Sequence, residues 1–307
     1  MSSDTLPATE APVTLRRPDS GHWQHRSQFR LAMRALRRDK MAVVALVVLA
    51  LVILVAVLAP WISPYDPLRG DPTIRLQPPG TPGHLLGLDG QGRDILSRLI
   101  WGGRYSLTVA IVPVLVAGVL ALIIGMLSGY RGGRWGEVTM RVLDVVFAFP
   151  IVLFAIAIAA VMGPGLVNSM TAIGITMVPY MARVVYTATV QESAKDYVEA
   201  ARAAGATHLE ILRKQLLPNV LSPLVVYGTT LAGLVIVLAA GLSFLGVGVT
   251  PPAPDWGVMT SDSRQVLLEG YPHVATIPGL VILVVALAFN LLGDGVRDAL
   301  DPHKQTA

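Results

Sequence analysis

The residues of this 307-residue chain that could carry out chemistry are few and dispersed. Asp89 and Asp94 have the acid and glycine spacing of a calcium loop, but Arg93 stands at a ligand position and Ile100 replaces the bidentate glutamate. The six histidines are scattered through tails and loops, and the absence of cysteine excludes thiol nucleophiles and thiolate metal sites. We therefore expect no catalytic residue, no metal and no cofactor in this chain.

A loop that binds nucleotide phosphates is also missing from the sequence. No G-x-x-x-x-G-K-[ST] pattern occurs, and the glycine-rich stretches 163–165 and 241–248 lack a following lysine. If ATP drives this protein, the nucleotide must bind to a partner chain.

The composition predicts an all-α integral membrane protein. Hydrophobic residues make up 53% of the chain and charged residues 14%, with a mean hydropathy of +0.60, which is too apolar for a soluble domain of this length. A spanning helix needs about 20 apolar residues, and the chain offers six such stretches. The six expected transmembrane helices cover residues 41–61, 107–130, 145–162, 166–182, 221–247 and 276–292.

Basic residues orient these spans. They crowd the tail 1–40, which we expect in the cytoplasm, with an amphipathic helix around Phe29, Met33 and Leu36 on the membrane surface. This charge is explained by lipid and topology and requires no nucleic acid. A cleaved signal peptide is the alternative for the first span, but its long basic leader favours a retained anchor. The resulting layout is an extracytoplasmic loop at 62–103, a membrane core at 104–294 with a cytoplasmic loop at 193–219, and a cytoplasmic tail at 295–307.

The loop 193–219 is a polar segment between two apolar spans, and its pattern predicts two short helices. A run of strong helix formers reaches Gly205, which fits a left-handed position after a helix end, and Pro218 is expected to end the second helix. Ser193 with Asp196, and Thr207 with Glu210, have the spacing of capping boxes. The alternatives are an ordinary loop with helical propensity and a DNA-reading helix-turn-helix, but tethering between membrane spans argues against DNA.

Ionisable side chains are absent from the deep interior of the six expected spans, which argues against a proton-driven transporter. Arg183 is the exception if the fourth span continues toward Val190. Polar side chains on the spans could line a hydrated path or form interhelical hydrogen bonds. The candidates for the path are Asn168, Tyr180, Tyr227 and Thr230.

Several motifs occur together in an order that resembles a known family. Glu199-Ala200-Ala201, Gly205 and Leu217-Pro218 resemble the EAA loop of bacterial ABC-importer permeases. The run 85–98, with Asp89, Gly92, Arg93 and Asp94, resembles the extracytoplasmic signature of the C-type permease of dipeptide, oligopeptide and nickel systems. Further matches lie at 148–150, 242–248, 256–257 and 290–302, so the likeness covers residues 29–302.

This resemblance implies a type I ABC-importer permease fold with cytoplasmic EAA coupling helices, in the bacterial inner membrane. It implies that the chain pairs with a B-type permease, that two cytoplasmic ATPase subunits hold ATP and magnesium, and that an extracytoplasmic substrate-binding protein delivers the cargo. The residues that it assigns to ATPase coupling are Glu199, Ala200, Ala201, Gly205, Leu217 and Pro218. Gln215, where isoleucine is common, and Leu88, where a small polar residue is common, depart from the family pattern.

The cargo is left open by the sequence. Short peptides are the leading hypothesis, because a metal importer would be expected to show histidines or carboxylates along its path. Nickel and glutathione are the alternatives within the same family. A stand-alone secondary transporter, which would need a buried acid or charged ring, is the alternative from another class, and a membrane enzyme is the third.

Overall fold

The computed structural model describes residues 33–34 and 36–300, so Phe29, most of the N-terminal tail and residues 301–307 lie outside it. Within the described residues the fold is helical, with only two isolated β-bridges, Thr81 with His84 and Leu88 with Asp94. The helices are α2 (Lys40–Val57), α3 (Ala59–Ile62), η1 (Pro72–Ile74), α4 (Ile95–Arg131), α5 (Gly133–Phe147), α6 (Ile151–Met162), α7 (Leu166–Ser193), α8 (Asp196–Ala203), α9 (His208–Glu210), η2 (Ile211–Leu216), α10 (Leu217–Phe244), α11 (Trp256–Asp262), α12 (Arg264–Leu268) and α13 (His273–Leu300).

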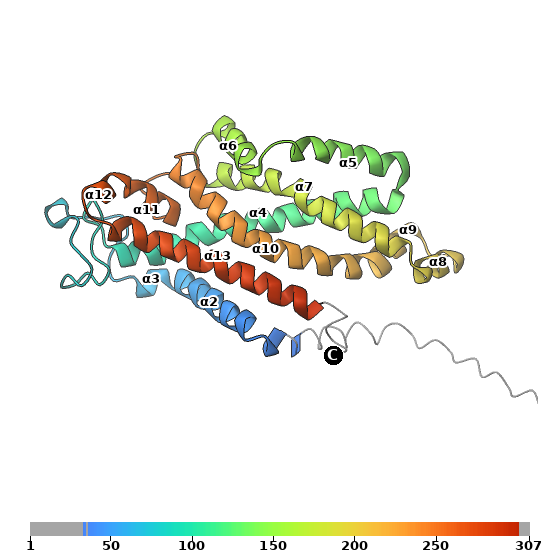
Figure 1. Cartoon of the computed structure of the whole chain (residues 1–307), viewed down its shortest axis with the longest axis horizontal. Helices are drawn as coiled ribbons and strands as arrows, with labels where there is room; N and C mark the ends of the chain where they lie inside the picture. Colours follow the sequence, from blue (N-terminus) through green and yellow to red (C-terminus); the bar gives the residue numbers. More distant parts are fainter. Residues whose placement is uncertain (1–32, 35, 301–307) are drawn as a thin grey trace, which may run out of the picture.

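The molecule is an elongated bundle with two different ends (Figure 1). Helices α4, α7, α10 and α13 run lengthwise, with α2 on one side of the bundle and α5 and α6 on the other. One end, here called the loop end, contains residues 63–94 together with α11 and α12. The opposite end, here called the coupling end, contains residues 194–216 with α8 and α9.

Small residues allow the central helices to approach closely, which is how membrane helices associate without a large hydrophobic driving force. A Cβ on Gly125 of α4 would lie 2.7 Å from the carbonyl oxygen of Ala182 on α7. A Cβ on Gly233 of α10 would lie 2.9 Å from the carbonyl oxygen of Ala286 on α13. These contacts fix α4 against α7 and α10 against α13 along the length of the bundle.

Helix α4 begins well before the expected span at 107–130. Asp94 caps it by accepting a hydrogen bond from the backbone N–H of Ser97 at 2.7 Å, so residues 95–103, expected in the loop, are helical. The helix ends at Gly132, whose φ of 59° lies in the left-handed region. Its 37 residues rise about 55 Å, well beyond the ~30 Å hydrocarbon core of a bilayer.

The expected third span, 145–162, is not one helix. Helices α5 and α6 are bent by 86° at the break between Phe147 and Ile151. Pro150 lies in the break, and because it has no N–H and restricts the residue before it, it favours this interruption. Among the described residues, five helices are long and apolar enough to cross a membrane, or six if the bent pair counts as one span.

The other expected boundaries shift by smaller amounts. The first span, 41–61, is divided into α2 and α3 at Leu58, just before Pro60. The fourth continues from 182 to Ser193, and the last continues from 292 to Leu300, so residues 295–300 of the expected tail are helical. Each helix extends into polar sequence at its end, which a hydropathy pattern does not include in the span.

Candidate functional site

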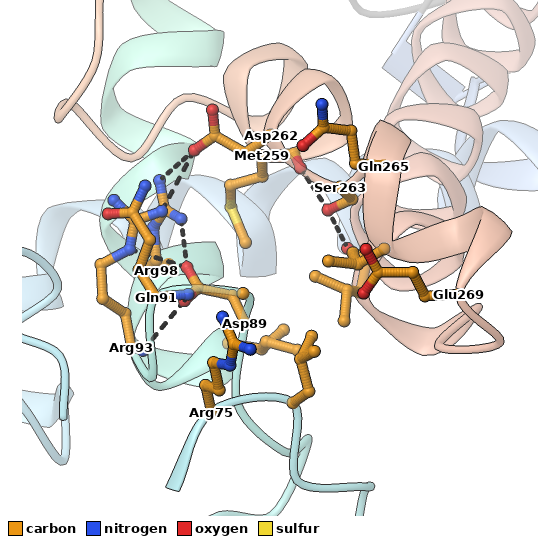
Figure 2. A pocket seen from close by; sticks show the side chains of 15 residues that line it. Arg75, Asp89, Gln91, Arg93, Arg98, Met259, Asp262, Ser263, Gln265 and Glu269 are labelled. Carbon is orange, nitrogen blue, oxygen red and sulfur yellow. Dashed lines mark hydrogen bonds and ion pairs between the residues drawn. The ribbon is translucent and has the colours of Figure 1, made fainter. Parts of the chain in front are cut away.

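Four charged side chains, three of them buried, form an ion cluster at the loop end (Figure 2). The carboxylate of Asp89 accepts hydrogen bonds from Nε of Arg93 at 2.7 Å and from Nη1 of Arg98 at 2.5 Å. Asp262 on α11 accepts from Nη2 of Arg93 at 3.1 Å and lies 3.6 Å from Nη2 of Arg98. The cluster therefore ties the loop, the start of α4 and α11 together; Asp89, Arg93 and Arg98 are buried, whereas Asp262 is partly exposed.

The chain around Gly92 is folded so tightly that only glycine fits there. Oδ1 of Asp89 accepts from the backbone N–H groups of Gln91 and Arg93 at 2.8 and 2.9 Å, which closes a turn with Gly92 at φ +73°. A Cβ on Gly92 would lie 1.9 Å from the carbonyl oxygen of Asp71, whose N–H donates to the Gly92 carbonyl at 3.1 Å. The signature spacing thus serves to build the turn that presents Asp89 and Arg93.

Asp94 completes the signature as the cap of α4. Its Oδ2 accepts from both the backbone N–H and the hydroxyl of Ser97 at 2.7 Å, and its Oδ1 lies 2.9 Å from Nδ1 of His84. A pocket of about 270 Å³ adjoins the cluster, with Arg75, Gln265 and Glu269 on its wall. In the part of the chain that the structure describes, no three histidine or acidic groups come together as a metal would require.

A second set of hydrogen bonds at the loop end joins α4 to α11, and the sequence did not predict it. Asp255 caps α11 by accepting from the N–H groups of Gly257 and Val258, and it accepts from the hydroxyl of Ser106 at 2.6 Å. Burial raises the pKa of Asp255 above its usual value, although these hydrogen bonds oppose the shift. Trp256 beside it donates from its indole N–H to the carbonyl of Leu99 at 3.0 Å.

At the coupling end, the turn at Gly205 forms as predicted. Helix α8 ends at Ala203, and Gly205 adopts a φ of +85°. The N–H of Gly205 donates to the carbonyl of Arg202, and that of Ala206 donates to Ala201, both at 3.0 Å, as in a Schellman motif. A Cβ on Gly205 would meet no atom within 4 Å, so the glycine is needed for its backbone conformation and not for space.

Of the two expected capping boxes, one is confirmed and one is wrong. Thr207 and Glu210 exchange both hydrogen bonds, at 3.3 Å from the N–H of Glu210 and 3.1 Å from the N–H of Thr207. The backbone N–H of Thr207 and the ammonium group of Lys214 lower the pKa of Glu210. Ser193 instead belongs to α7, which runs further than expected, and α8 is capped at Lys195 without a side-chain hydrogen bond.

The expectation that Pro218 ends the second helix is also wrong. Residues His208 to Phe244 form one continuous helical stretch, in which Ile211–Leu216 is a π-helical turn and Pro218 lies in the first turn of α10. A proline in a helix removes one N–H and crowds a carbonyl of the preceding turn, and the wider π turn before it relieves both conflicts. Leu217 and Pro218 therefore begin a spanning helix. Residues 194–216, here called the coupling segment, lead directly into it.

Tyr197 joins three helices at the coupling end. Its hydroxyl donates to Glu192 on α7 at 2.7 Å and accepts from the amide of Asn219 on α10 at 3.1 Å. Burial, together with the adjacent Glu192 carboxylate, raises the pKa of Tyr197 to about 12, so the hydroxyl stays protonated as a donor. No sequence pattern indicated this joint, because its members lie on three elements.

The outer face of α8 is open to solvent. Glu199, Ala200 and Gly205 are exposed and Ala201 is partly exposed, whereas Val198 is fully buried and holds the helix to the bundle. A further contact ties the segment to the end of α4, where the hydroxyl of Tyr130 lies 2.8 Å from Nδ1 of His208. The coupling segment is thus held from within and leaves its acidic and small residues free for another surface.

The four residues considered for a path lie in different settings. The Asn168 amide donates back to the carbonyls of Met162 and Gly163, and Thr230 packs against Gly293 of α13. Tyr180 packs on Phe147 with ring centroids 4.5 Å apart, and Tyr227 lies on α10, which packs against α7. Tyr180 and Tyr227 lie near one another on these two helices, and the place of all four residues along a path stays a prediction.

Arg183 lies inside a span, as expected if the fourth span continues toward Val190. Because α7 continues to Ser193, this arginine is inside a spanning helix, with its side chain 48% exposed. It donates to Asp144 on α5, and its guanidinium stacks over the ring of Phe147 at 4.6 Å. This ion pair lies at the junction of α5 and α7, and both of its side chains are about half exposed.

Comparison with known families identifies the family to which this architecture belongs. Residues 121–306 match the family described as binding-protein-dependent transport system inner membrane component, and residues 27–79 match the N-terminal TM domain of oligopeptide transport permease C. The chain belongs to this family of ABC-importer permeases, as a C-type subunit of the peptide-transporter group. The permease is thus a multi-span membrane subunit of a bacterial importer, and its family implies a partner permease and an ATPase.

Curated relatives and a solved structure agree with this assignment. The permease is 38% identical to the di/tripeptide transport system permease protein DppC of Pseudomonas aeruginosa, over 98% of this chain and 97% of that protein. It is 42% identical to the glutathione transport system permease protein GsiD of Pectobacterium atrosepticum, over 90% and 92% of the two chains. A structure of the MetNI methionine ABC transporter matches with a TM-score of 0.55 and 22% identity, over 67% of this chain and 97% of that chain, which supports the type I permease fold.

Proposed function

We propose that this permease forms, together with a B-type permease, the path through which an ATP-driven importer carries short peptides across the bacterial inner membrane. The coupling end faces the cytoplasm, where two ATPase subunits dock, and both termini lie on that side. The loop end faces outward toward a substrate-binding protein. The single observation that carries this proposal is the exposed face of α8, whose segment leads without a break into the spanning helix α10.

In this arrangement Glu199, Ala200, Ala201 and Gly205 contact the ATPase, and Leu217 and Pro218 pass its movement to α10. The exposed alanines permit close backbone approach, and the turn at Gly205 holds α8 at an angle to the helix that follows. ATP-driven closure of the ATPase pair would then shift two docked segments and rearrange the permeases around the path between them.

The docking surface is tested by reversing its charge. We expect Glu199→Lys to abolish ATP-dependent uptake while the permease remains in the membrane, because the substitution alters an exposed residue and removes no packing. Glu137→Lys, a matched charge reversal at an exposed residue of α5, is the control and should import normally. Uptake by the Glu199→Lys variant at the wild-type rate would overturn the proposed role of α8.

Glutathione is the second candidate cargo, because relatives at 41% and 42% identity are named glutathione permeases. Cells that lack and then regain this permease should be offered labelled dipeptides, tripeptides, glutathione and nickel in competition. Restored uptake of dipeptides and tripeptides supports the proposal, whereas restored uptake of glutathione or nickel alone replaces the cargo. Movement of any cargo by the purified chain without an ATPase would instead indicate a stand-alone transporter.

A further inference from the structure

A groove of about 460 Å³, lined by both apolar and polar residues, runs between α7 and α10, on the part of α7 that leads to the coupling end. Its wall includes Arg183, Thr187, Gln191 and Glu192 of α7, and Asn219 and Pro223 of α10. Arg183, Thr187 and Gln191 recur every four positions and share one face of α7, and Glu192 lies farther round the helix, on the side opposite Arg183. The volume lies within the range of about 300–1,000 Å³ that is typical of small-molecule sites.

The two ends of this groove carry opposite charges. Arg183 and Glu192 are nine positions apart, which corresponds to about 13.5 Å along the axis of α7. An extended peptide spans about 3.3–3.6 Å for each residue, so the two charges match the ends of a peptide of two to four residues, once the reach of both side chains is allowed for. Thr187 and Gln191, between the two charged residues, supply a hydroxyl and an amide along the same wall.

The donors and acceptors needed for such a ligand are present at both ends. The guanidinium of Arg183 has five N–H donors, and the structure gives it one hydrogen bond, to Asp144 on α5, which does not line the groove. An arginine in this state can bind a carboxylate through two parallel hydrogen bonds. Glu192 is largely buried, and its two oxygens accept from Lys195 at 2.5 Å and from Tyr197 at 2.7 Å, which leaves acceptor capacity for an ammonium group.

Lipid is a poor occupant for this surface. A half-exposed arginine and a glutamate on a spanning helix are costly against hydrocarbon, and such residues in membrane proteins mark water-filled paths or protein contacts. The groove therefore faces either water or another protein chain.

We propose that this groove binds the cargo peptide as a zwitterion, with its terminal carboxylate on Arg183 and its α-ammonium group on Glu192. The inference rests on the proposed function and adds to it a cargo-contacting site inside the permease. Glu192 also holds Tyr197, so a peptide ammonium group at Glu192 competes with Lys195 for a carboxylate that forms part of the joint between α7, α8 and α10. Binding of a peptide in the groove thereby changes the hydrogen bonds that hold the coupling segment to α7.

The test uses the complete transporter in proteoliposomes, with the binding protein saturated, and compares a dipeptide with its C-terminal amide. We expect Arg183→Gln to lower ATP-dependent uptake of the free-acid dipeptide by about tenfold or more. Uptake of the amide should be unchanged, because only the free acid has a carboxylate that Arg183 can bind. Arg183→Lys should recover part of the free-acid uptake. Arg141→Gln, at an exposed arginine of α5 outside the groove, is the matched control and should change neither rate.

An equal loss of both substrates in Arg183→Gln, or no loss of either, would overturn the site, and the proposed function would stand as long as the wild-type complex imports peptides with ATP. If the wild type imports no peptide at all, the proposed function itself fails. A photo-crosslinking amino acid placed at Thr187 gives an independent readout. Crosslinks to a labelled dipeptide support the site, and crosslinks to the partner permease alone would show that the groove is a subunit contact.

Discussion

The loop end and the coupling end of the bundle use charged residues and glycines in two opposite ways. At the loop end, Asp89, Arg93 and Arg98 are buried and bound to one another, so their charges hold the structure together. At the coupling end, Glu199 is exposed and the bonds around it lie within the segment itself. Two motifs that look alike in the sequence, as short polar signatures, therefore differ in the structure: one is buried and holds neighbouring elements together, and the other is an exposed surface.

The glycines of the two ends differ in the same way. A Cβ on Gly92 would overlap the backbone of Asp71, whereas a Cβ on Gly205 would meet nothing within 4 Å. Both adopt a positive φ, so a side chain is strained at either position, but only Gly92 is also enclosed. The turn at Gly92 should therefore tolerate almost no substitution, and the turn at Gly205 should tolerate substitutions that leave its backbone in place.

The largest effect is expected from breaking the buried cluster. Asp89→Ala leaves Arg93 and Arg98 with much of their charge uncompensated, and loss of one partner of a buried ion pair costs about 3–5 kcal/mol. We expect a large drop in the thermal unfolding temperature of the purified permease. Asp66→Ala, which removes the solvent-exposed pair with Arg69, should cost less than about 1 kcal/mol. Similar losses for the two variants would show that the loop end is no more rigid than its surface.

A smaller effect is expected at the turn of the coupling segment. Gly205→Ala places a side chain at φ +85°, which costs about 1–2 kcal/mol, and we expect this strain to tilt α8 and lower uptake while the bundle unfolds at nearly the wild-type temperature. Gly279→Ala is the matched control, because Gly279 lies in α13 without positive φ or near neighbours. A loss of global stability as large as that of Asp89→Ala would remove the contrast between the ends.

The smallest effect is expected from the cap that follows this turn. Thr207→Ala removes the side-chain acceptor for the N–H of Glu210, at a cost of about 1 kcal/mol that is confined to the first turn of α9. Hydrogen exchange should become faster for the amides of residues 208–211 and remain unchanged in α4. Thr139→Ala, whose hydroxyl bonds only within α5, is the control, and equal protection of residues 208–211 in both variants would argue against the capping box.

The sequence could predict those parts of the fold that depend on local pattern. Apolar length located the spans, Gly205 marked a left-handed turn and Thr207 with Glu210 marked a cap, because each of these signals lies within a few residues. The bend at Pro150 follows from that proline, whereas the π turn before Pro218 was missed, because one proline interrupts a helix and the other is accommodated in one. What differs between them is the backbone around the ring, which the residue type does not reveal.

The candidate sites divide in the same manner. Motif spacing identified Asp89, Arg93 and Asp94, but their burial and the pairing with Asp262 depend on α11, more than 160 positions along the chain. The joint at Tyr197 and the pair of Arg183 with Asp144 also combine different helices. The start of α4 is the exception, since Asp94 followed by Ser97 is a capping signal that the sequence contained and that hydropathy alone obscured.

The π turn at Ile211–Leu216 stands between the coupling segment and the rest of α10. A π turn closes its hydrogen bonds over one more residue than an α turn, so the helix contains one residue beyond the regular winding. If docking or release of the ATPase drew this extra residue out, every side chain of α10 beyond it would rotate by about 100° and advance by about 1.5 Å. The permease thus holds one additional residue between the coupling end and α10, and a one-residue change of helix register there would turn a different face of α10 toward α7 and α13.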